Sequence, residues 1–539
     1  MRDGVILRAD VYRPDGENPV PAIVYRTPYD RSSPLIPLAA VDPERAVEAG
    51  FALVVQDVRG RYGSDGSFYT FSHEGRDGFD TIEWAASQPW CDGAVGMAGR
   101  SYGGAAQWLA ALERPPHLRA IAPVVIGTDF FHNWVYQGGA FQLGFNLFWA
   151  LLMFAPKESR RTDEHSRHLP LLNLPVLREI PEARFYFDWL EHSRYDGYWA
   201  RLAVAPRHSR VLAPAFNVGG WYDVFLGGTL NNYTGMRNSG GSELARTGQR
   251  LVVGPWAHGS TYGPFPDHRF GVFGGHDAID VDGLLLDYFA VQLRDAPPPE
   301  GDSPVRLFVM GENRWRDEDD WPLARARPAQ WFLRAGGLLD VERPGDEAAD
   351  EYVYDPADPA PTIGGPTSLP ARMFRTNTGP LDQRPVEARA DVLVYTSQPL
   401  RRPLEATGPL LIVLYAATTA PDTDFVVKLS DVAPDGFSRI LAEGILRARF
   451  RDGDEREATT LPGRPYEYRI DLVATSNVFG IGHRIRVAVT SSSFPRFDRN
   501  GNSGRPLGTD RLEDLRPARQ TIFHDRERAS HLVLPVVPS

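Results

Sequence analysis

The chain has 539 residues, of which 42% are hydrophobic and 24% are charged. One hydrophobic core does not grow to this size, so the length predicts about two to four domains of an ordinary globular protein. The net charge of −11, with no basic cluster, excludes a nucleic-acid-binding protein, and the single Cys91 excludes an internal disulfide framework.

The beginning of the chain alternates apolar and polar residues from Val5 to Val11, as a strand does, and shows no signal peptide. So abrupt a start indicates that a few upstream residues are missing. With one cysteine and no signal peptide, we expect a cytoplasmic protein. The most apolar stretch, residues 140–155, is shorter than the ~20 residues of a membrane helix and contains Gln142 and Asn146. We therefore expect a buried helix there and no membrane partner.

Residues 1–128 alternate short apolar runs with amphipathic stretches. The runs predict strands at 21–25, 51–55, 94–98 and 118–126, with helices at 77–87 and after Ser101. Such alternation is typical of a mostly parallel sheet with helices on both faces, the first part of an α/β core.

The rest of the chain divides into three parts. Residues 129–208 are crowded with aromatic side chains and predict a helical cap inserted into the core. The strand and helix rhythm returns over 209–303, with strands at 211–218 and 250–254, and ends in the Pro-rich segment 296–304. Many short strand candidates over 304–539 predict a C-terminal β-sandwich, most naturally a jelly roll.

The sequence Gly99-Arg-Ser-Tyr-Gly103 lies between the strand at 94–98 and a helix. Strand, Gly-x-Ser-x-Gly and helix together form the nucleophile elbow of an α/β-hydrolase, in which glycines make room where the two backbones crowd the turn. This context predicts that Ser101 is a nucleophile. The alternative is a small residue at the start of an ordinary helix.

A serine nucleophile needs a base and a carboxylate that orients the base, and in this fold class they follow in the order Ser, Asp or Glu, His. His258 fits as the base because it follows the strand at 250–254, and His268 and His276 are its competitors. Asp223 fits as the acid one strand earlier. The alternative acids, which belong to the insertion, are Asp129, Asp188 and Asp196. We expect Asp57 and Asp65 to pair instead with Arg59 or Arg61.

An acyl transfer also needs hydrogen-bond donors for the oxyanion. The elbow supplies the amide of Tyr102. A second donor is expected from the loop 26–31, where the hydroxyl of Tyr29 is the candidate because Pro28 has no N–H.

Five motifs in this order resemble the CocE/NonD family of serine hydrolases, namely Arg26-Thr-Pro-Tyr-Asp-Arg31, Asp57-Val-Arg-Gly-Arg-Tyr-Gly-Ser-Asp-Gly66, Gly99–Gly103, Gly219-Gly-Trp-Tyr-Asp223 and Gly254-Pro-Trp-Ala-His258. The resemblance spans nearly the whole chain. It implies an α/β-hydrolase core with a helical cap and a C-terminal jelly roll, and the triad Ser101, Asp223 and His258. It also implies an oxyanion hole of Tyr29 and Tyr102, and no metal or cofactor.

The resemblance also bears on the substrate. Phe225 matches an aromatic residue of the acyl pocket in the cocaine-esterase branch, and Trp134 and Trp149 are further candidates for its wall. The α-amino acid ester hydrolases of the family place carboxylates just after the nucleophile, where this chain has Gly103-Gly-Ala105. A serine esterase for bulky or aromatic acyl groups is the function that fits best. An acylase or dipeptidyl-peptidase acting on amides, and a non-catalytic binding protein, are the alternatives, and a homo-oligomer stays open.

One late stretch, Asp498-Arg-Asn-Gly-Asn502, begins like a calcium-binding loop. The position where such a loop carries its bidentate Glu holds Thr509 instead. We therefore expect a turn that Asn and Gly stabilise.

Overall fold

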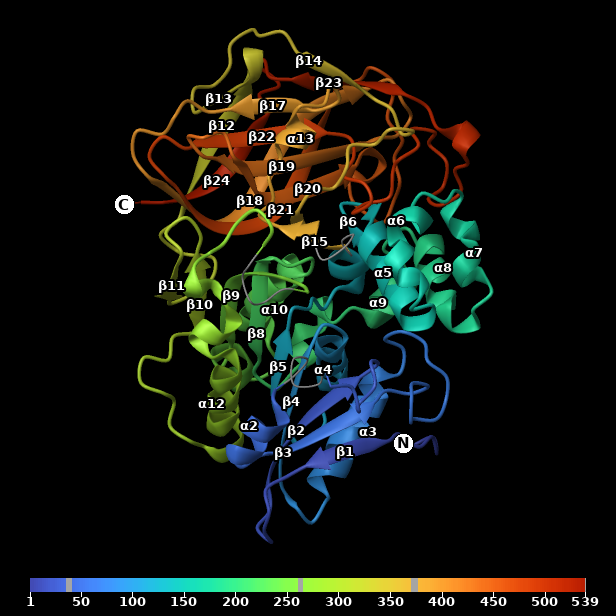
Figure 1. The fold of residues 1–539 in the computed structure, drawn as a ribbon, viewed down its shortest axis with the longest axis vertical. Helices are drawn as coiled ribbons and strands as arrows, with labels where there is room; N and C mark the ends of the chain where they lie inside the picture. Colours follow the sequence, from blue (N-terminus) through green and yellow to red (C-terminus); the bar gives the residue numbers. More distant parts are fainter. Residues whose placement is uncertain (35–40, 260–264, 370–376, 539) are drawn as a thin grey trace.

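A nine-stranded sheet runs through the N-terminal half of the computed structural model, which describes residues 1–34, 41–259, 265–369 and 377–538 (Figure 1). All neighbouring strands are parallel except for the two edge strands, β1 and β11. In spatial order the strands are β1 (Ala9–Tyr12), β3 (Ala52–Asp57), β2 (Val20–Thr27), β4 (Cys91–Arg100), β5 (Leu118–Val124), β8 (Phe216–Tyr222), β9 (Arg250–Ala257), β10 (Val305–Val309) and β11 (Arg314–Glu318).

Helices cover both faces of this sheet because successive strand residues point to opposite sides. Val24 and Val54 pack with helices α3 (Glu74–Ala86) and α4 (Tyr102–Leu112). Their neighbours Ile23 and Leu53 pack with α2 (Pro43–Glu48) and α12 (Val281–Arg294). Burial on both faces explains why these strands are continuous apolar runs. The predicted α/β core is confirmed.

The segment between β5 and β8 forms a helical body beside the carboxyl ends of the strands (Figure 1). Its longest helix, α5 (Leu143–Phe154), is buried along most of its length, as expected for the apolar stretch. The described residues contain no helix with the length and apolar character to cross a membrane. The other cap elements are η1 (Phe131–Val135), β6 (Tyr136–Gln137), β7 (Ala140–Phe141), η2 (Glu158–Arg161), α6 (Thr162–His165), η3 (Leu171–Asn173), α7 (Pro175–Arg178), η4 (Pro181–Ala183), α8 (Arg184–Glu191), α9 (Gly197–Leu202) and η5 (Ala205–Arg210).

The core continues beyond the Pro-rich segment 296–304, where the sequence pattern suggested a boundary. After α10 (Leu226–Ser239), α11 (Glu243–Thr247), β9 and α12, strand β10 pairs in parallel with β9 and β11 folds back on it. The sequence pattern assigned Val305–Val309 to the C-terminal domain, whereas in the structure this strand extends the sheet of the core. The proline-rich segment marks the end of helix α12 and not the end of the domain. The apolar run after it forms β10, which completes a unit of strand β9, helix α12 and strand β10.

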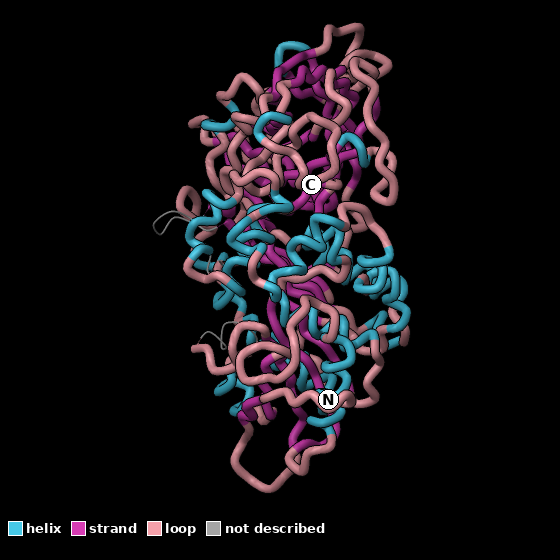
Figure 2. Tube along the Cα trace, turned by 90° about the vertical axis from the view of Figure 1, so that its right-hand side faces the viewer, coloured by secondary structure: helices cyan, strands magenta, loops and turns pink. Residues whose placement is uncertain are grey.

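The C-terminal part is an all-β domain, as predicted, and the side view shows strands with few helices there (Figure 2). Its mainly antiparallel sheet contains eleven strands, and a separate hairpin joins β15 to β16. The strands are β12 (Arg327–Arg334), β13 (Leu338–Asp340), β14 (Asp350–Tyr354), β15 (Gly365–Leu369), β16 (Asn377–Gly379), β17 (Leu393–Thr396), β18 (Leu404–Thr418), β19 (Asp424–Val432), β20 (Ser438–Arg447), β21 (Tyr466–Phe479), β22 (Arg484–Thr490), β23 (Ala518–Phe523) and β24 (His531–Val537). The described part of this domain also contains the short helices η8 (Ala335–Gly337), α13 (Arg384–Glu387), η9 (Ala448–Phe450) and η10 (Leu512–Asp514).

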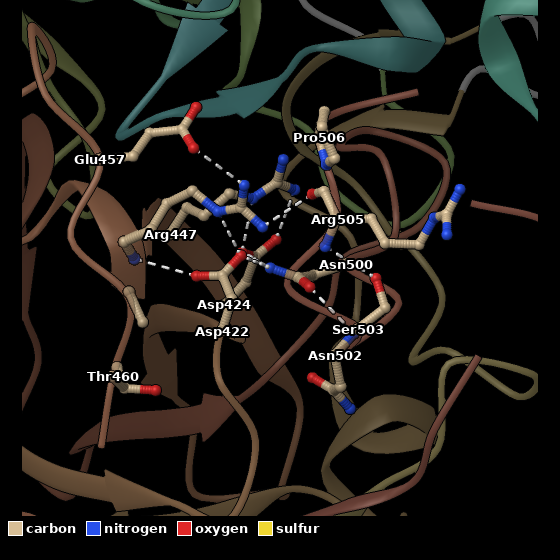
Figure 3. A network of polar contacts seen from close by, with 12 residues as sticks. Asp422, Asp424, Arg447, Glu457, Thr460, Asn500, Asn502, Ser503, Arg505 and Pro506 are labelled. Carbon is tan, nitrogen blue, oxygen red and sulfur yellow. Dashed lines mark hydrogen bonds and ion pairs between the residues drawn. The ribbon is translucent and has the colours of Figure 1, made fainter. Parts of the chain in front are cut away.

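A buried polar network lies in the C-terminal domain where it meets the cap (Figure 3). Arg447 makes two hydrogen bonds to Asp424, of 2.8 and 2.9 Å, and another of 3.0 Å to Asp498. Asn500 donates to Asp422 and Asp424. Asp498 also accepts the backbone N–H of Phe141 in the cap at 2.8 Å. Removing one partner would leave a buried charge uncompensated, and Asp498 connects this network to the cap backbone.

This network explains the stretch that begins like a calcium-binding loop. Asn502 has φ +57° and its N–H donates to the Asn500 side chain at 2.9 Å, so Asn does support a turn here. Asp498, however, pairs with Arg447. The sequence could not show this pairing because 51 residues separate the two side chains.

His132 forms a second link between the cap and the C-terminal domain. Its Nδ1 lies 2.7 Å from Asp129 and its Nε2 bonds to Asp454. Burial opposes charge on the imidazole, but the two carboxylates outweigh it and raise the pKa of His132 to about 9. The protonated ring therefore bridges the two parts at neutral pH.

We expect this bridge to make stability depend on pH. A pKa raised on folding contributes stability that is complete below the unfolded value of about 6.5 and is lost as the pH rises through about 9. The melting temperature of wild type should therefore fall more steeply between pH 7 and 10 than that of His132→Gln. His168→Gln, which changes a half-buried cap histidine that contacts the backbone carbonyl of Asn173, should follow wild type. Identical pH profiles for His132→Gln and wild type would contradict the bridge.

Candidate active site

Ser101 occupies a strained turn between β4 and α4. Its φ of +55° and ψ of −120° are unusual for a residue with a side chain, and its N–H is held by a 2.9 Å bond to the carbonyl of Val124. Glycine is required on either side of this turn because there is no room for a Cβ atom. A Cβ on Gly99 would lie 2.7 Å from the Tyr25 ring, and one on Gly103 would lie 2.5 Å from it. The predicted elbow is thus present, and the Ser101 side chain projects at the carboxyl edge of the sheet.

His258 and Asp223 meet Ser101 at that edge. Nε2 of His258 lies 3.1 Å from Oγ of Ser101, and Nδ1 of His258 lies 3.1 Å from Oδ2 of Asp223. The other carboxylate oxygen of Asp223 accepts the N–H of Phe225 at 2.7 Å. Asp223 is buried, so two hydrogen bonds hold it toward the imidazole. This is the hydrogen-bonding pattern of a Ser-His-Asp triad.

Each of these three residues directly follows a strand. Ser101 comes after β4, Asp223 after β8 and His258 after β9. The strands at 211–218 and 250–254 were expected to end earlier, so both boundaries were wrong by three or four residues. Glycine and proline suggested loops, but the strands continue through them.

The alternative residues are engaged elsewhere. Asp129 bonds to His132, and Asp196 caps α9 through the N–H of Tyr198. Asp188 accepts from Arg184 and from the hydroxyl of Tyr69. Of the two competing histidines, the ring of His268 packs against Phe270 and that of His276 against Trp256.

Tyr29 lies two residues beyond β2, with its hydroxyl beside the nucleophile. The hydroxyl accepts a 2.9 Å hydrogen bond from the indole N–H of Trp149. Burial raises the pKa of Tyr29 to about 12, against the opposing effect of hydrogen bonds to Trp149 and Ser101. The phenol is therefore protonated at neutral pH and can donate a hydrogen bond.

Tyr102 is the first residue of α4, so no carbonyl within its own helix can accept its N–H. Its side chain points into the core, where the hydroxyl donates to Glu74 at 2.9 Å and accepts the N–H of Phe71 at 3.1 Å. Arg26 pairs with the same Glu74 at 2.7 Å. These contacts anchor the first turn of α4, which leaves the Tyr102 amide beside Ser101 as a second donor.

Aromatic rings surround the imidazole. Phe225 lies edge-on to His258 with 5.0 Å between ring centroids, and Trp134 stacks on Phe225 at 4.8 Å. Trp149 meets Trp134 edge-on at 5.5 Å. The structure therefore brings all three predicted aromatic residues into one wall beside the candidate triad.

Sequence reasoning missed two residues of this region. Phe145 lies 5.7 Å from the His258 ring and 5.1 Å from the Phe225 ring. It precedes Trp149 by four residues on α5, so its helical spacing could have indicated that both face the same side.

Arg61 was expected only as a partner of Asp57 or Asp65. It donates instead to the carbonyls of Pro28 and Met153, which joins the Tyr29 loop to the cap.

The expected pairing of Asp57 was also wrong. Asp57 accepts hydrogen bonds from the backbone and guanidinium of Arg31. Arg59 pairs with Asp77 on α3 instead. Asp57 ends β3 and pairs in the sheet with Thr27, the last residue of β2. The loop after β2 then brings Arg31 back to Asp57, while Arg59 turns toward the helix layer.

Comparisons with known proteins agree with this architecture. A family model described as X-Pro dipeptidyl-peptidase (S15 family) matches residues 3–260. The model for the X-Pro dipeptidyl-peptidase C-terminal non-catalytic domain matches residues 300–533. Cocaine esterase from Rhodococcus sp. (strain MB1 Bresler) is 36% identical over 568 residues, which covers 100% of this chain and 97% of the esterase.

Solved structures resemble the chain along its whole length. An aminopeptidase from the marine sediment archaeon Thaumarchaeota archaeon superposes with a TM-score of 0.88 at 26% identity, covering 100% of this chain and 95% of its own. An α-amino acid ester hydrolase superposes with a TM-score of 0.86 at 28% identity, covering 99% and 95%.

Proposed function

Because the chain belongs to the CocE/NonD family of serine hydrolases, we propose that it cleaves carboxylic esters through an acyl-enzyme on Ser101. The observation that carries the proposal is the position of His258, which lies 3.1 Å from Ser101 on one side and 3.1 Å from Asp223 on the other. A serine hydroxyl becomes a competent nucleophile when a base within hydrogen-bonding distance takes its proton.

The reaction proceeds in two halves. Oγ of Ser101 attacks the ester carbonyl while Nε2 of His258 takes the serine proton, and the carboxylate of Asp223 stabilises the imidazolium through Nδ1–H. His258 then gives the proton to the departing alkoxide, and the alcohol leaves. In the second half a water molecule loses a proton to His258 and attacks the acyl carbon, which releases the acid and returns the proton to Ser101.

Two donors stabilise the negative oxygen of each tetrahedral intermediate. The N–H of Tyr102 is fixed by the elbow, and the hydroxyl of Tyr29 keeps its proton because its pKa is about 12. Trp149 directs its indole N–H at the oxygen of Tyr29, so that oxygen acts as the acceptor for Trp149 and its proton is left for the substrate. Donors held in place in this way lower the free energy of the transition state most when they point at the oxygen on which negative charge develops.

The wall of aromatic rings beside Ser101 indicates what kind of acyl group the substrate carries. Phe145, Phe225 and Trp134 contribute apolar surface next to the nucleophile. The residues directly after Tyr102 are Gly103 and Gly104, so the elbow offers no carboxylate to a substrate ammonium group. These observations support a bulky or aromatic acyl group. The resemblance to an aminopeptidase makes amide hydrolysis the second candidate.

A graded series of p-nitrophenyl esters, from acetate to octanoate with benzoate, tests the proposed activity. We expect kcat/KM to be highest for the bulkier acyl groups, and Ser101→Ala to abolish turnover of all of them. The corresponding anilides should turn over far more slowly than the esters. Equal rates for anilides and esters would favour the amide hydrolase, and unchanged turnover by Ser101→Ala would refute the triad.

Replacing the hydroxyl of Tyr29 tests the oxyanion donor. Loss of one such donor lowers kcat by about 10²–10³. Tyr29→Phe should show that loss at nearly unchanged KM, because the donor acts on the intermediate and not on the ground-state ester. Tyr62→Phe, which removes a hydroxyl from an exposed residue nearby, should keep the wild-type kcat. If both variants keep it, Tyr29 is not a donor.

A further inference from the structure

A cavity of about 600 Å³ lies away from Ser101, between the core and the cap. Its core side is formed by the beginning of α3 and the end of α4, and its cap side by α9 and η5. Four arginines line it, Arg76 from α3 and Arg201, Arg207 and Arg210 from the cap. Their separation in the chain explains why the sequence shows no basic cluster.

The positive charge in this cavity is not neutralised by the protein. Among the described residues, no carboxylate forms an ion pair with Arg76, Arg201, Arg207 or Arg210. The one acidic residue in the lining is Glu113. With His73 neutral, four arginines and one glutamate give the lining a net charge of +3. The whole chain, in contrast, has a net charge of −11.

Arg207 is held in a fixed place within this cluster. Its Nε donates to the carbonyl of Ala203 at 2.8 Å, and its Nη2 donates to the carbonyl of Arg201 at 2.9 Å. Burial and the neighbouring charge of Arg210 lower the pKa of Arg207, which means that its protonated form is disfavoured here. The negative charge of a bound anion would oppose both effects by favouring the protonated guanidinium.

The remainder of the cavity is apolar. Leu109 and Leu112 of α4 and Leu202 of α9 line it beside the arginines. A pocket lined by both arginine and leucine side chains fits a molecule with an anionic head and an apolar body.

From this arrangement we propose that the cavity binds a small organic phosphate. A phosphoryl group has charge close to −2 and three oxygens, so it can be shared by several guanidinium groups, whereas a carboxylate offers one charge and two oxygens. The volume exceeds what a phosphate ion fills, and the leucines accommodate the organic part. The concave shape favours a small molecule over a membrane surface.

Occupancy would also tie the cap to the core. Tyr69 of the same lining donates its hydroxyl to Asp188 of the cap at 2.7 Å. Phe71, also in the lining, donates its N–H to the hydroxyl of Tyr102. A ligand that bridges Arg76 and the cap arginines would strengthen this junction, so it should raise the melting temperature as it binds.

Isothermal titration calorimetry with phenyl phosphate tests the proposal on the full chain. The enzyme is first inactivated at Ser101 with a fluorophosphonate, so that binding at the catalytic site does not contribute. We expect saturable binding that weakens with added salt. Inorganic phosphate should bind more weakly because it lacks the apolar part, and benzyl alcohol more weakly because it lacks the charge.

Three variants locate the site. Arg76→Gln and Arg210→Gln should each raise the Kd for phenyl phosphate about tenfold, or ~1.4 kcal/mol. Arg119→Gln removes an equal charge from an exposed residue outside the lining and should leave the Kd unchanged.

Several outcomes would overturn the proposal. One is the absence of binding, and another is an equal loss of affinity in all three variants. Affinity for vesicles of phosphatidic acid in phosphatidylcholine, with none for phenyl phosphate, would assign the arginines to a membrane surface instead. Binding of benzoate as tight as that of phenyl phosphate would refute the phosphoryl preference.

Discussion

The backbone conformation of Ser101 is the constraint on which the rest of the site depends. A residue with a side chain at φ +55° and ψ −120° costs about 1–3 kcal/mol and persists only where its surroundings impose it. Here β5 and α4 hold the turn from both sides, because the Ser101 N–H bonds to Val124 at the end of β5 and the Ser101 carbonyl accepts from Gly104 and Ala105 in α4. This strained conformation places Oγ of Ser101 at the edge of the sheet where Asp223 follows β8 and His258 follows β9.

A bulge in β9 completes that placement. Gly220 pairs with Gly254, whereas Tyr222 pairs with Ala257, so β9 carries an extra residue over this interval. The bulge lets Pro255 lie within a central strand, where a regular ladder would require its missing N–H. The sequence Gly254-Pro255 was therefore mistaken for a loop, since a bulge and a loop contain the same residues.

Much of this protein could be predicted from local pattern. Strand and helix periodicity indicated the α/β core, and the elbow, Asp223 and His258 were found because each lies at the end of an apolar run. Contacts between distant segments could not be predicted in this way. Examples are the contacts of Arg447 with Asp498 and of Asp57 with Arg31, and the gathering of four arginines in the cavity. Loop conformation and the packing of distant segments bring these residues together. Phe145 is intermediate, because its spacing from Trp149 was visible but its direction was not.

Trapping the covalent intermediate tests the central claim most directly. Wild type is mixed with p-nitrophenyl benzoate, quenched in acid within one turnover, digested and analysed by mass spectrometry. The account predicts a benzoyl group on Ser101 of the peptide that contains the elbow, and none in Ser101→Ala. A benzoyl group on another residue, or release of p-nitrophenol in the first turnover with no acylated peptide, would contradict the account.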